Sequence, residues 1–231
     1  MRHAVLAIPV CAALCLVSCA GFGIDWGIAD TAGVKAPSHK IALVAGEGLR
    51  EPFAIDFDAH GNLYVAEMGG QGVSVIDKTG KVTKLAGTGE AGLSGDGGPA
   101  ASARLNNPHH LLLAPEDRPT DRPQGRQRGQ QLYVADTLNF SVRVIDLRTR
   151  VITRLAGTGQ KGFTGDGGPA IDAQFGGIYA LALRGRLLYA CDLDNRRVRT
   201  INLDTGIVNT IAGILHIADS ENHRVLSVDP R

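Results

Sequence analysis

The chain has 231 residues, of which 44% are hydrophobic and 30 are glycine, so it is long enough for a sizeable core and is not compositionally disordered. Lysine and arginine together number 24, against 23 for aspartate and glutamate, which leaves a formal net charge of +1. This balance gives no electrostatic reason to expect nucleic acid or an anionic membrane surface as a partner.

The N-terminal stretch predicts an export signal and a tether. The apolar run Ala4–Val17 is too short for a transmembrane helix and is typical of a secretory signal. It ends in Leu-Val-Ser-Cys-Ala, which resembles a bacterial lipobox, so we expect a signal peptide at residues 1–19 that ends at a lipidated Cys19. A plain signal peptide is the alternative. Residues 20–39 lack periodicity and predict a tether, which would place the protein at the cell envelope, or else in the periplasm or medium.

Short strand patterns that end in an acidic residue recur four times in the rest of the chain. They are Leu63–Glu67, Leu132–Asp136, Leu188–Asp192 and Leu215–Asp219. A turn and a second β-rich run follow each one, and in three cases a third run ends in Ala-Gly. An apolar run also precedes three of them, at Phe53–Phe57, His110–Ala114 and Ile178–Leu183. A unit of four short strands joined by tight turns predicts an all-β propeller with four-stranded antiparallel blades, in preference to a sandwich.

The phase of the repeat predicts about four blades within residues 40–231. The first three span roughly 53–86, 109–155 and 178–212, because each of these ranges holds a complete unit. Residues 214–228 match only the second and third strands, and residues 40–45 match only the fourth. We therefore expect the two ends of the chain to complete one blade, which would remove open sheet edges.

Three segments carry a family resemblance. DTLNFSV at Asp136–Val142, DLDNRRV at Asp192–Val198 and DSENHRV at Asp219–Val225 resemble the NHL repeat, and the glycine-rich connectors resemble those of bacterial NHL-repeat lipoproteins. The resemblance implies a β-propeller, usually of six blades, that serves most often as a binding platform. The chain departs from the pattern where a connector and an inner strand are missing between Gly213 and Ile214, so an incomplete six-bladed propeller is an open alternative.

Two glycine-rich segments contain the letters of a dinucleotide-binding loop, G-x-G-x-x-G. They are Gly87–Ala100 and Gly157–Ala170. More glycines and a proline follow these letters, whereas a phosphate-binding loop opens a helix. We therefore expect blade connectors, each followed at most by a short helical turn, and no nucleotide. Asp96 and Asp166 are expected to form Asx turns, with a calcium site as the alternative and no other cofactor.

Candidate binding residues lie on the predicted strands and hairpins. His109 and His110 stand at the start of an inner strand, where adjacent residues face opposite sides, so we expect one of them to face the central channel. Metal binding is not expected, because the equivalent positions hold Phe, Ala and Tyr. Arg143, Arg197 and Arg224 are further candidates, although the repeated Asp and Asn around them favour a structural role in the hairpins.

The residues predict a binding protein more than an enzyme. The chain lacks G-x-S-x-G, H-E-x-x-H, C-x-x-C and Walker motifs, so we assign no catalytic residue. We expect a non-catalytic scaffold for a protein, peptide or carbohydrate ligand, joined to the membrane by its lipid. The resemblance leaves two alternatives, a lyase-type or lactonase-type propeller with a metal in the channel and a truncated propeller without a competent site. Residues 115–131, rich in Pro, Gly and charge, predict an irregular loop.

Overall fold

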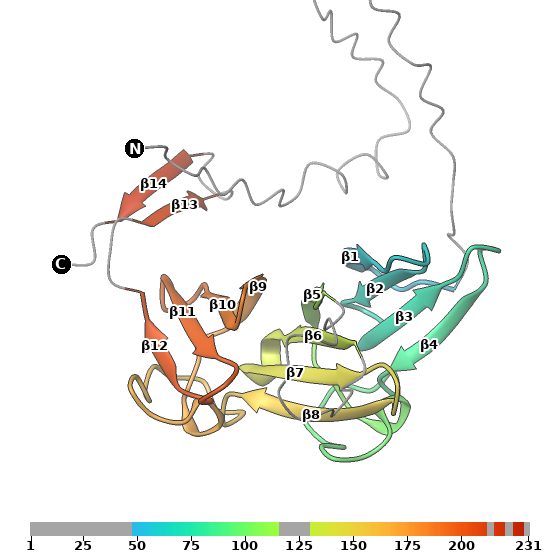
Figure 1. Ribbon diagram of the computed structural model, residues 1–231, viewed down its shortest axis with the longest axis horizontal. Helices are drawn as coiled ribbons and strands as arrows, with labels where there is room; N and C mark the ends of the chain where they lie inside the picture. The colour runs from blue at the N-terminus through green and yellow to red at the C-terminus, as the bar shows by residue number, and fades with distance from the viewer. Residues whose placement is uncertain (1–47, 116–129, 212–214, 220–223, 229–231) are drawn as a thin grey trace, which may run out of the picture. The chain divides into compact units, whose positions relative to one another are not determined.

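The computed structural model describes residues 48–115, 130–211, 215–219 and 224–228. These residues form three four-stranded antiparallel sheets and one two-stranded sheet (Figure 1). The expected signal peptide, the tether, the strand at 40–45 and most of the loop at 115–131 fall outside this part of the chain. The three complete sheets are propeller blades, which confirms the predicted fold class.

Each complete blade is a meander whose strands pair in chain order. Blade 1 consists of β1 (Pro52–Phe57), β2 (Leu63–Glu67), β3 (Gly72–Ile76) and β4 (Val82–Ala86). Blade 2 consists of β5 (Pro108–Leu113), β6 (Gln131–Asp136), β7 (Ser141–Asp146) and β8 (Val151–Ala156). Blade 3 consists of β9 (Ile178–Arg184), β10 (Leu187–Asp192), β11 (Arg197–Asn202) and β12 (Val208–Thr210). The strand β13 (Leu215–Asp219) pairs with β14 (Arg224–Val228).

The core lies between consecutive blades because alternate strand residues face opposite sides of each sheet. Tyr64 and Ala66 of blade 1 pack with Leu111 and Val134 of blade 2. The equivalent residues of blade 2, Tyr133 and Ala135, pack with a second set of apolar residues that blade 3 supplies, Ile178, Leu181, Leu188 and Ile201. The inner strands β1, β5 and β9 are successive neighbours in this stack.

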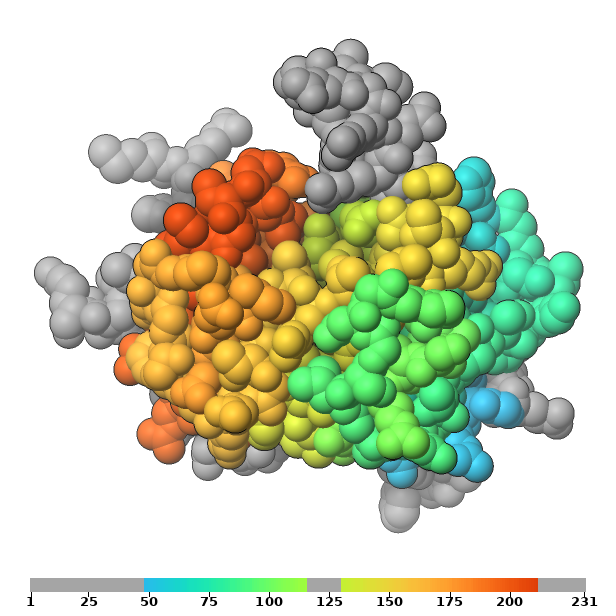
Figure 2. Space-filling view, turned by 90° about the horizontal axis from the view of Figure 1, so that it is seen from below, coloured from blue at the N-terminus to red at the C-terminus, as the bar shows by residue number. Residues whose placement is uncertain are grey.

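Two long connectors join the blades, and they behave as the sequence predicts. Each ends in a 3-10 turn of three residues, η1 (Ala100–Ser102) or η4 (Ala170–Asp172), that begins directly after a proline. The two connectors touch, since a Cβ added to Gly159 would lie 2.4 Å from Cδ2 of Leu93. They lie side by side in Figure 2, green for the first and orange-yellow for the second. No helix among the described residues is long and apolar enough to cross a membrane.

Each connector also extends the outer edge of the blade that it leads to. In the first connector, the amide of Gly97 donates to the carbonyl of Ile152 on β8 over 2.7 Å, and the amide of Ile152 donates to Gly98 over 3.0 Å. Gly167 and Gly168 make the same pair of bonds with Val208 of β12. The outermost strands of blades 2 and 3 therefore carry a hydrogen-bonded partner on both sides.

Candidate functional site

Three aromatic rings form a row at the start of the inner strands. Each ring belongs to the residue directly after the one that pairs with the last residue of the second strand, at a break in the register of its blade. Phe53, His109 and Tyr179 therefore occupy one repeated position. The ring centroids of Phe53 and His109 are 4.6 Å apart, and those of His109 and Tyr179 are also 4.6 Å apart. These are separations of favourable aromatic pairs. The aromatic row therefore links all three blades.

The backbone bend that begins β5 orients the His109 ring. Its Nδ1 lies 2.7 Å from the carbonyl oxygen of Asn107, and because a carbonyl oxygen only accepts, Nδ1 donates this hydrogen bond. Asn107 has a left-handed φ of 49° and exchanges two hydrogen bonds, of 2.7 and 2.9 Å, with the side chain of Gln71. Gln71 lies between β2 and β3, so blade 1 helps to orient His109.

The two histidines that the sequence singles out face different surroundings. His109 is buried within the row, beside Phe53, which remains 38% exposed. His110 pairs with Ala135, a residue of the core between blades 2 and 3, and its Nδ1 is buried and finds no hydrogen-bond partner in the described part of the chain. Burial lowers the pKa of His110, and the negative charge of Asp56 partly offsets this effect. His109 thus belongs to the row, whereas His110 is an uncharged residue of the sheet.

Arg143 of β7 is completely buried beneath the first connector. Its guanidinium lies 2.9 Å from Oδ1 of Asp96 in the connector and 3.3 Å from Oδ2 of Asp136 at the end of β6. It also donates to the carbonyl oxygens of Ser94, over 3.1 Å, and Arg104, over 3.3 Å. One side chain thus joins a blade to three residues of the segment that precedes it, Ser94, Asp96 and Arg104.

Blade 3 repeats this arrangement with Arg199 of β11, which is also completely buried. Arg199 donates to the carbonyl oxygens of Thr164 and Gln174, both over 2.9 Å, and to Oδ1 of Asp166 over 2.8 Å. We call these two arrangements, centred on Arg143 and Arg199, the arginine clasps. Their charges are paired and their carbonyl partners are fixed, so they stabilise the connectors.

Buried acids complete the clasps. Asp136 accepts hydrogen bonds from the amide of Asn106, over 2.7 Å, and from the side chain of Asn139, over 2.8 Å. Burial raises the pKa of Asp136 to about 6, although these donors and Arg143 act in the opposite direction. Asn139 also donates to the carbonyl of Gly92 in the connector over 2.7 Å. The counterparts in blade 3 are Asp192 and Asn195, which donates to the carbonyl of Gly162 over 2.7 Å.

The remaining arginine candidates are not members of the clasps, although Arg197 shares the ring of Phe163 with Arg199, whose guanidinium carbon lies 5.2 Å from its centroid. Arg197 is exposed, and its guanidinium carbon lies 4.2 Å from the ring centroid of Phe163. Arg224 begins β14, and its side chain falls outside the described part of the chain. The structure therefore does not bring Arg143, Arg197 and the histidines together into one site.

Sequence reasoning missed Arg199 and the role of the connector acids. Asp96 and Asp166, expected as Asx-turn residues or calcium ligands, each contact a buried arginine. The signal that could have found the clasps is the Val-Arg pair at residues 142–143 and 198–199, which is present in the two units that follow a long glycine connector. Within the described residues, no group of three or more His, Cys, Asp or Glu side chains could hold a metal ion.

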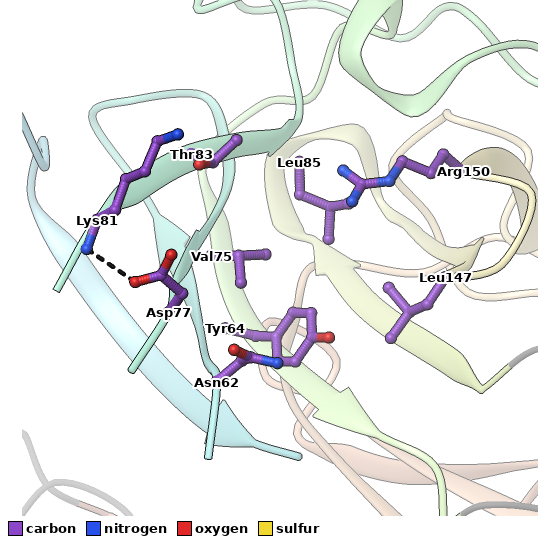
Figure 3. Close-up of a pocket in the computed structure, with 9 residues that line it drawn as sticks. All are labelled: Asn62, Tyr64, Val75, Asp77, Lys81, Thr83, Leu85, Leu147 and Arg150. Carbon is purple, nitrogen blue, oxygen red and sulfur yellow. Dashed lines mark hydrogen bonds between the residues drawn. The ribbon is translucent and has the colours of Figure 1, made fainter. Parts of the chain in front are cut away.

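A pocket of about 250 Å³ lies between blades 1 and 2, at the opposite end of the strands from the aromatic row (Figure 3). Its lining is mixed and consists of Asn62, Tyr64, Val75, Asp77, Lys81, Thr83, Leu85, Leu147 and Arg150. The carboxylate of Asp77 already accepts hydrogen bonds within its own turn, from the backbone amides of Thr79 and Lys81. The pocket therefore offers fewer free polar groups than its composition suggests.

Comparisons with known proteins find partial matches. No protein-family model matches it. It is 36% identical to the bovine (Bos taurus) NHL repeat-containing protein 2 over 81 residues, which is 34% of this chain and 11% of that protein. It is 34% identical to the human (Homo sapiens) protein of the same name over 92 residues, or 39% of this chain and 12% of that protein. The chain thus spans about a tenth of the length of these relatives.

A solved structure supports the same fold. The auxiliary nutrient binding protein of Bacteroides ovatus matches 68% of this chain and 37% of its own chain, with a TM-score of 0.51 and 22% identity. At this level of identity the likeness concerns the fold alone.

Proposed function

Because the chain consists of NHL-type repeats that fold as β-propeller blades, we propose that it is a non-catalytic binding scaffold whose ligand contacts the aromatic row. The observation that supports this proposal is the convergence of Phe53, His109 and Tyr179 from three separate blades, with successive centroids 4.6 Å apart. The repeated architecture keeps the position the same, while the three residues differ. The residue type at this position differs between blades whose structure is otherwise repeated, which favours a role in contacting a ligand over a role in the architecture of the blade.

The chemistry of the row suits a ligand that has both an apolar face and polar groups, such as a carbohydrate or a peptide. Aromatic rings give a large apolar contact area at low cost in conformational entropy. The exposed part of Phe53 would provide an apolar contact and Nε2 of His109, the ring nitrogen that does not bond to Asn107, a polar one. The Bacteroides ovatus protein carries the name nutrient binding protein, which is in line with a small-ligand scaffold.

We also propose that the scaffold acts outside the cytoplasm. The support is the run Ala4–Val17 followed by Cys19, which is typical of an exported, lipid-anchored protein. Metabolic labelling with a radioactive fatty acid tests this part, since label should enter the wild-type protein and be lost in Cys19→Ala. Label retained in that variant would contradict the anchor.

Binding to glycan and peptide arrays tests the scaffold proposal. The wild-type chain should bind a defined set of array ligands, and Phe53→Ala combined with Tyr179→Ala should reduce that binding at least about tenfold, as expected for the loss of two aromatic anchors. Leu187→Ala is the matched control, because Leu187 is 37% exposed and lies at the other end of blade 3. Equal binding by the double variant and the control would refute the role of the row.

A further inference from the structure

The pocket between blades 1 and 2 carries two positively charged side chains, one from each blade. Lys81 directly precedes β4 of blade 1, and Arg150 directly precedes β8 of blade 2. Figure 3 shows the Arg150 side chain extending toward Leu85, across the pocket. Within the residues that the structure describes, neither cation forms an ion pair or a side-chain hydrogen bond. An anion in the pocket would therefore meet two cationic groups that these residues leave without an acceptor.

The acidic groups around the pocket, in contrast, are engaged in their own turns. Oδ1 of Asp77 accepts from the Thr79 hydroxyl over 2.6 Å, in addition to the two amides, and this bond lowers the pKa of Asp77. Oδ1 of Asp58 accepts from the amides of His60 and Asn62, both over 2.9 Å, and Oδ2 accepts from the side chain of Asn62 over 2.8 Å. The acceptors that line the pocket are thus occupied, whereas its cationic donors are not.

The backbone of Arg150 is also unusual, because it has a left-handed φ of 57°. Glycine holds this position of the same turn in the other blades, at Gly80 with φ of 83° and at Gly206 with φ of 71°. The amide of Ala100 donates to the Arg150 carbonyl over 2.8 Å, just as that of Ala170 donates to Gly206 over 2.7 Å. A side chain in this conformation costs about 1 kcal/mol relative to glycine. An arginine at a position that suits glycine favours a function for its side chain.

The space between blades 2 and 3 has the same kind of wall without the two cations. Blade 1 forms a cross-strand row that blade 2 repeats in the same register, so that Tyr64, Val75 and Thr83 correspond to Tyr133, Val144 and Thr153. Val151 occupies the position of Lys81, and Gly206 occupies that of Arg150. The row is therefore common architecture, whereas the cations are specific to the pocket between blades 1 and 2.

The remainder of the pocket suits a small ligand with an apolar body. The apolar part of the lining consists of Val75, Leu85, Leu147 and the ring of Tyr64. The positive charge of Arg150 acts on this ring, since burial and the charge of Asp58 raise the pKa of Tyr64 and Arg150 partly offsets that effect. The volume of about 250 Å³ lies below the roughly 300–1,000 Å³ of pockets for drug-sized ligands. The pocket therefore suits a molecule of about the size of one aromatic ring with a charged group.

We propose that this pocket is a second binding site, separate from the aromatic row, for a small organic carboxylate. The guanidinium of Arg150 matches the two oxygens of a carboxylate, and Lys81 supplies a second positive charge. The apolar body of the ligand would contact Leu85 and Tyr64. A carboxylate carries a single charge, whereas a phosphate ester carries nearly two. The single charge is the better match, because the charge of Asp77 offsets one of the two cations.

Titration with benzoate, followed by NMR of the backbone amides, tests the site. Saturable shifts should cluster at Lys81, Thr83 and Leu147, which line the pocket. Benzamide has the same shape but no charge, and it should bind at least about tenfold more weakly. A wild-type chain without saturable shifts at these amides, or with equal affinity for benzamide, would overturn the proposal. Inorganic phosphate that bound more tightly than benzoate would overturn the choice of a carboxylate.

Substitution of Arg150 tests the residue that carries the proposal. Arg150→Gly introduces the residue that blade 3 has at this position, so the variant should fold as the wild type does, and benzoate should bind at least about tenfold more weakly. Arg148→Ala is the matched control, because Arg148 is an exposed arginine of the same turn and does not line the pocket. It should bind benzoate as the wild type does. Unchanged affinity in Arg150→Gly, or an equal loss in both variants, would refute the site. The benzoate shifts report on this pocket and not on array binding, so failure of this site and failure of the proposed function are distinguishable.

Discussion

Blades 2 and 3 differ from blade 1 in how they hold the chain that precedes them. Blades 2 and 3 follow long connectors, and each buries an arginine, Arg143 or Arg199, that binds connector carbonyls and a connector acid. Blade 1 has Ser74 at this position, and the Ser74 hydroxyl donates to Glu67. A cation reaches Glu67 from β4 instead, where Nζ of Lys84 lies 3.3 Å from its carboxylate.

This difference indicates that a buried arginine at this position accompanies a long preceding connector and is not a general feature of the blade. In the last unit, which lacks a preceding connector in the sequence, the same position holds Leu226. A fully buried guanidinium is costly to desolvate, and it is stable only where enough acceptors surround it. The connector carbonyls and Asp96 or Asp166 supply those acceptors, so the arginine and the connector depend on each other.

Removal of a clasp arginine should have the largest effect. Arg143→Ala removes the positive charge beside the buried Asp136 and the donor to the carbonyl oxygens of Ser94 and Arg104, and the free energy of unfolding should fall by about 3–5 kcal/mol. Urea unfolding followed by circular dichroism measures this loss. Arg197→Ala is the control, because this exposed arginine lies over the face of Phe163 and should contribute at most about 1 kcal/mol. Similar losses in both variants would contradict a special role for the clasp.

Substitutions of connector glycines should come next and should separate two kinds of position. Gly157 has φ of 92°, and a Cβ there would lie 2.2 Å from the carbonyl oxygen of Phe140, so Gly157→Ala should cost about 2–4 kcal/mol in the same unfolding measurement. Gly167 has φ of 80° and open space around it, so Gly167→Ala should cost only about 1 kcal/mol. Equal costs would show that close packing of the connector against blade 2 does not matter.

The buried acid of blade 2 should make stability depend on pH. The folded pKa of Asp136, raised to about 6, lies above its value in the unfolded chain, so the folded state binds the proton more tightly and stability falls as pH rises from about 4 to about 6. The change should not exceed about 3 kcal/mol. Asp136→Asn should remove this dependence, as measured by unfolding at several pH values. An unchanged pH profile in the variant would assign the effect to another group.

Substitution of Lys84, the cation that pairs with Glu67 in blade 1, should have the smallest effect. Lys84 is partly exposed, and its ion pair with Glu67 is accordingly screened by solvent. Lys84→Met should lower the free energy of unfolding by only about 0.5–1 kcal/mol. A loss as large as that of Arg143→Ala would mean that blade 1 depends on its ion pair as strongly as blade 2 does.

The strands could be predicted from the sequence because each blade repeats the same local pattern. Leu63–Glu67 is reproduced without change, and the neighbouring acid-ending strand starts one residue earlier than expected, at Gln131. The short turn after Pro99 was likewise predictable, because proline opens such turns. These features depend on local residue types and on spacing.

Long-range partners could not be predicted in this way. Arg143 lies on a strand where a charged residue is ordinarily expected to face solvent, and only the folded connector supplies its acceptors. Ile55 shows the opposite case, since its apolar strand predicts burial but the residue is 54% exposed. One of His109 and His110 was expected at the channel, but the choice of His109 and its contacts with Phe53 and Tyr179 required the relative placement of three blades.

The hydrogen bonds between each connector and the next outermost strand have a consequence for synthesis of the chain. The ribosome makes Gly97 and Gly98 well before Ile152, and it makes Gly167 and Gly168 before Val208. The partner for the edge of each of these blades is therefore already present when the last strand of that blade emerges. A nascent blade 2 or blade 3 can close its edge at once, which shortens the time during which an unpaired strand could associate with another chain.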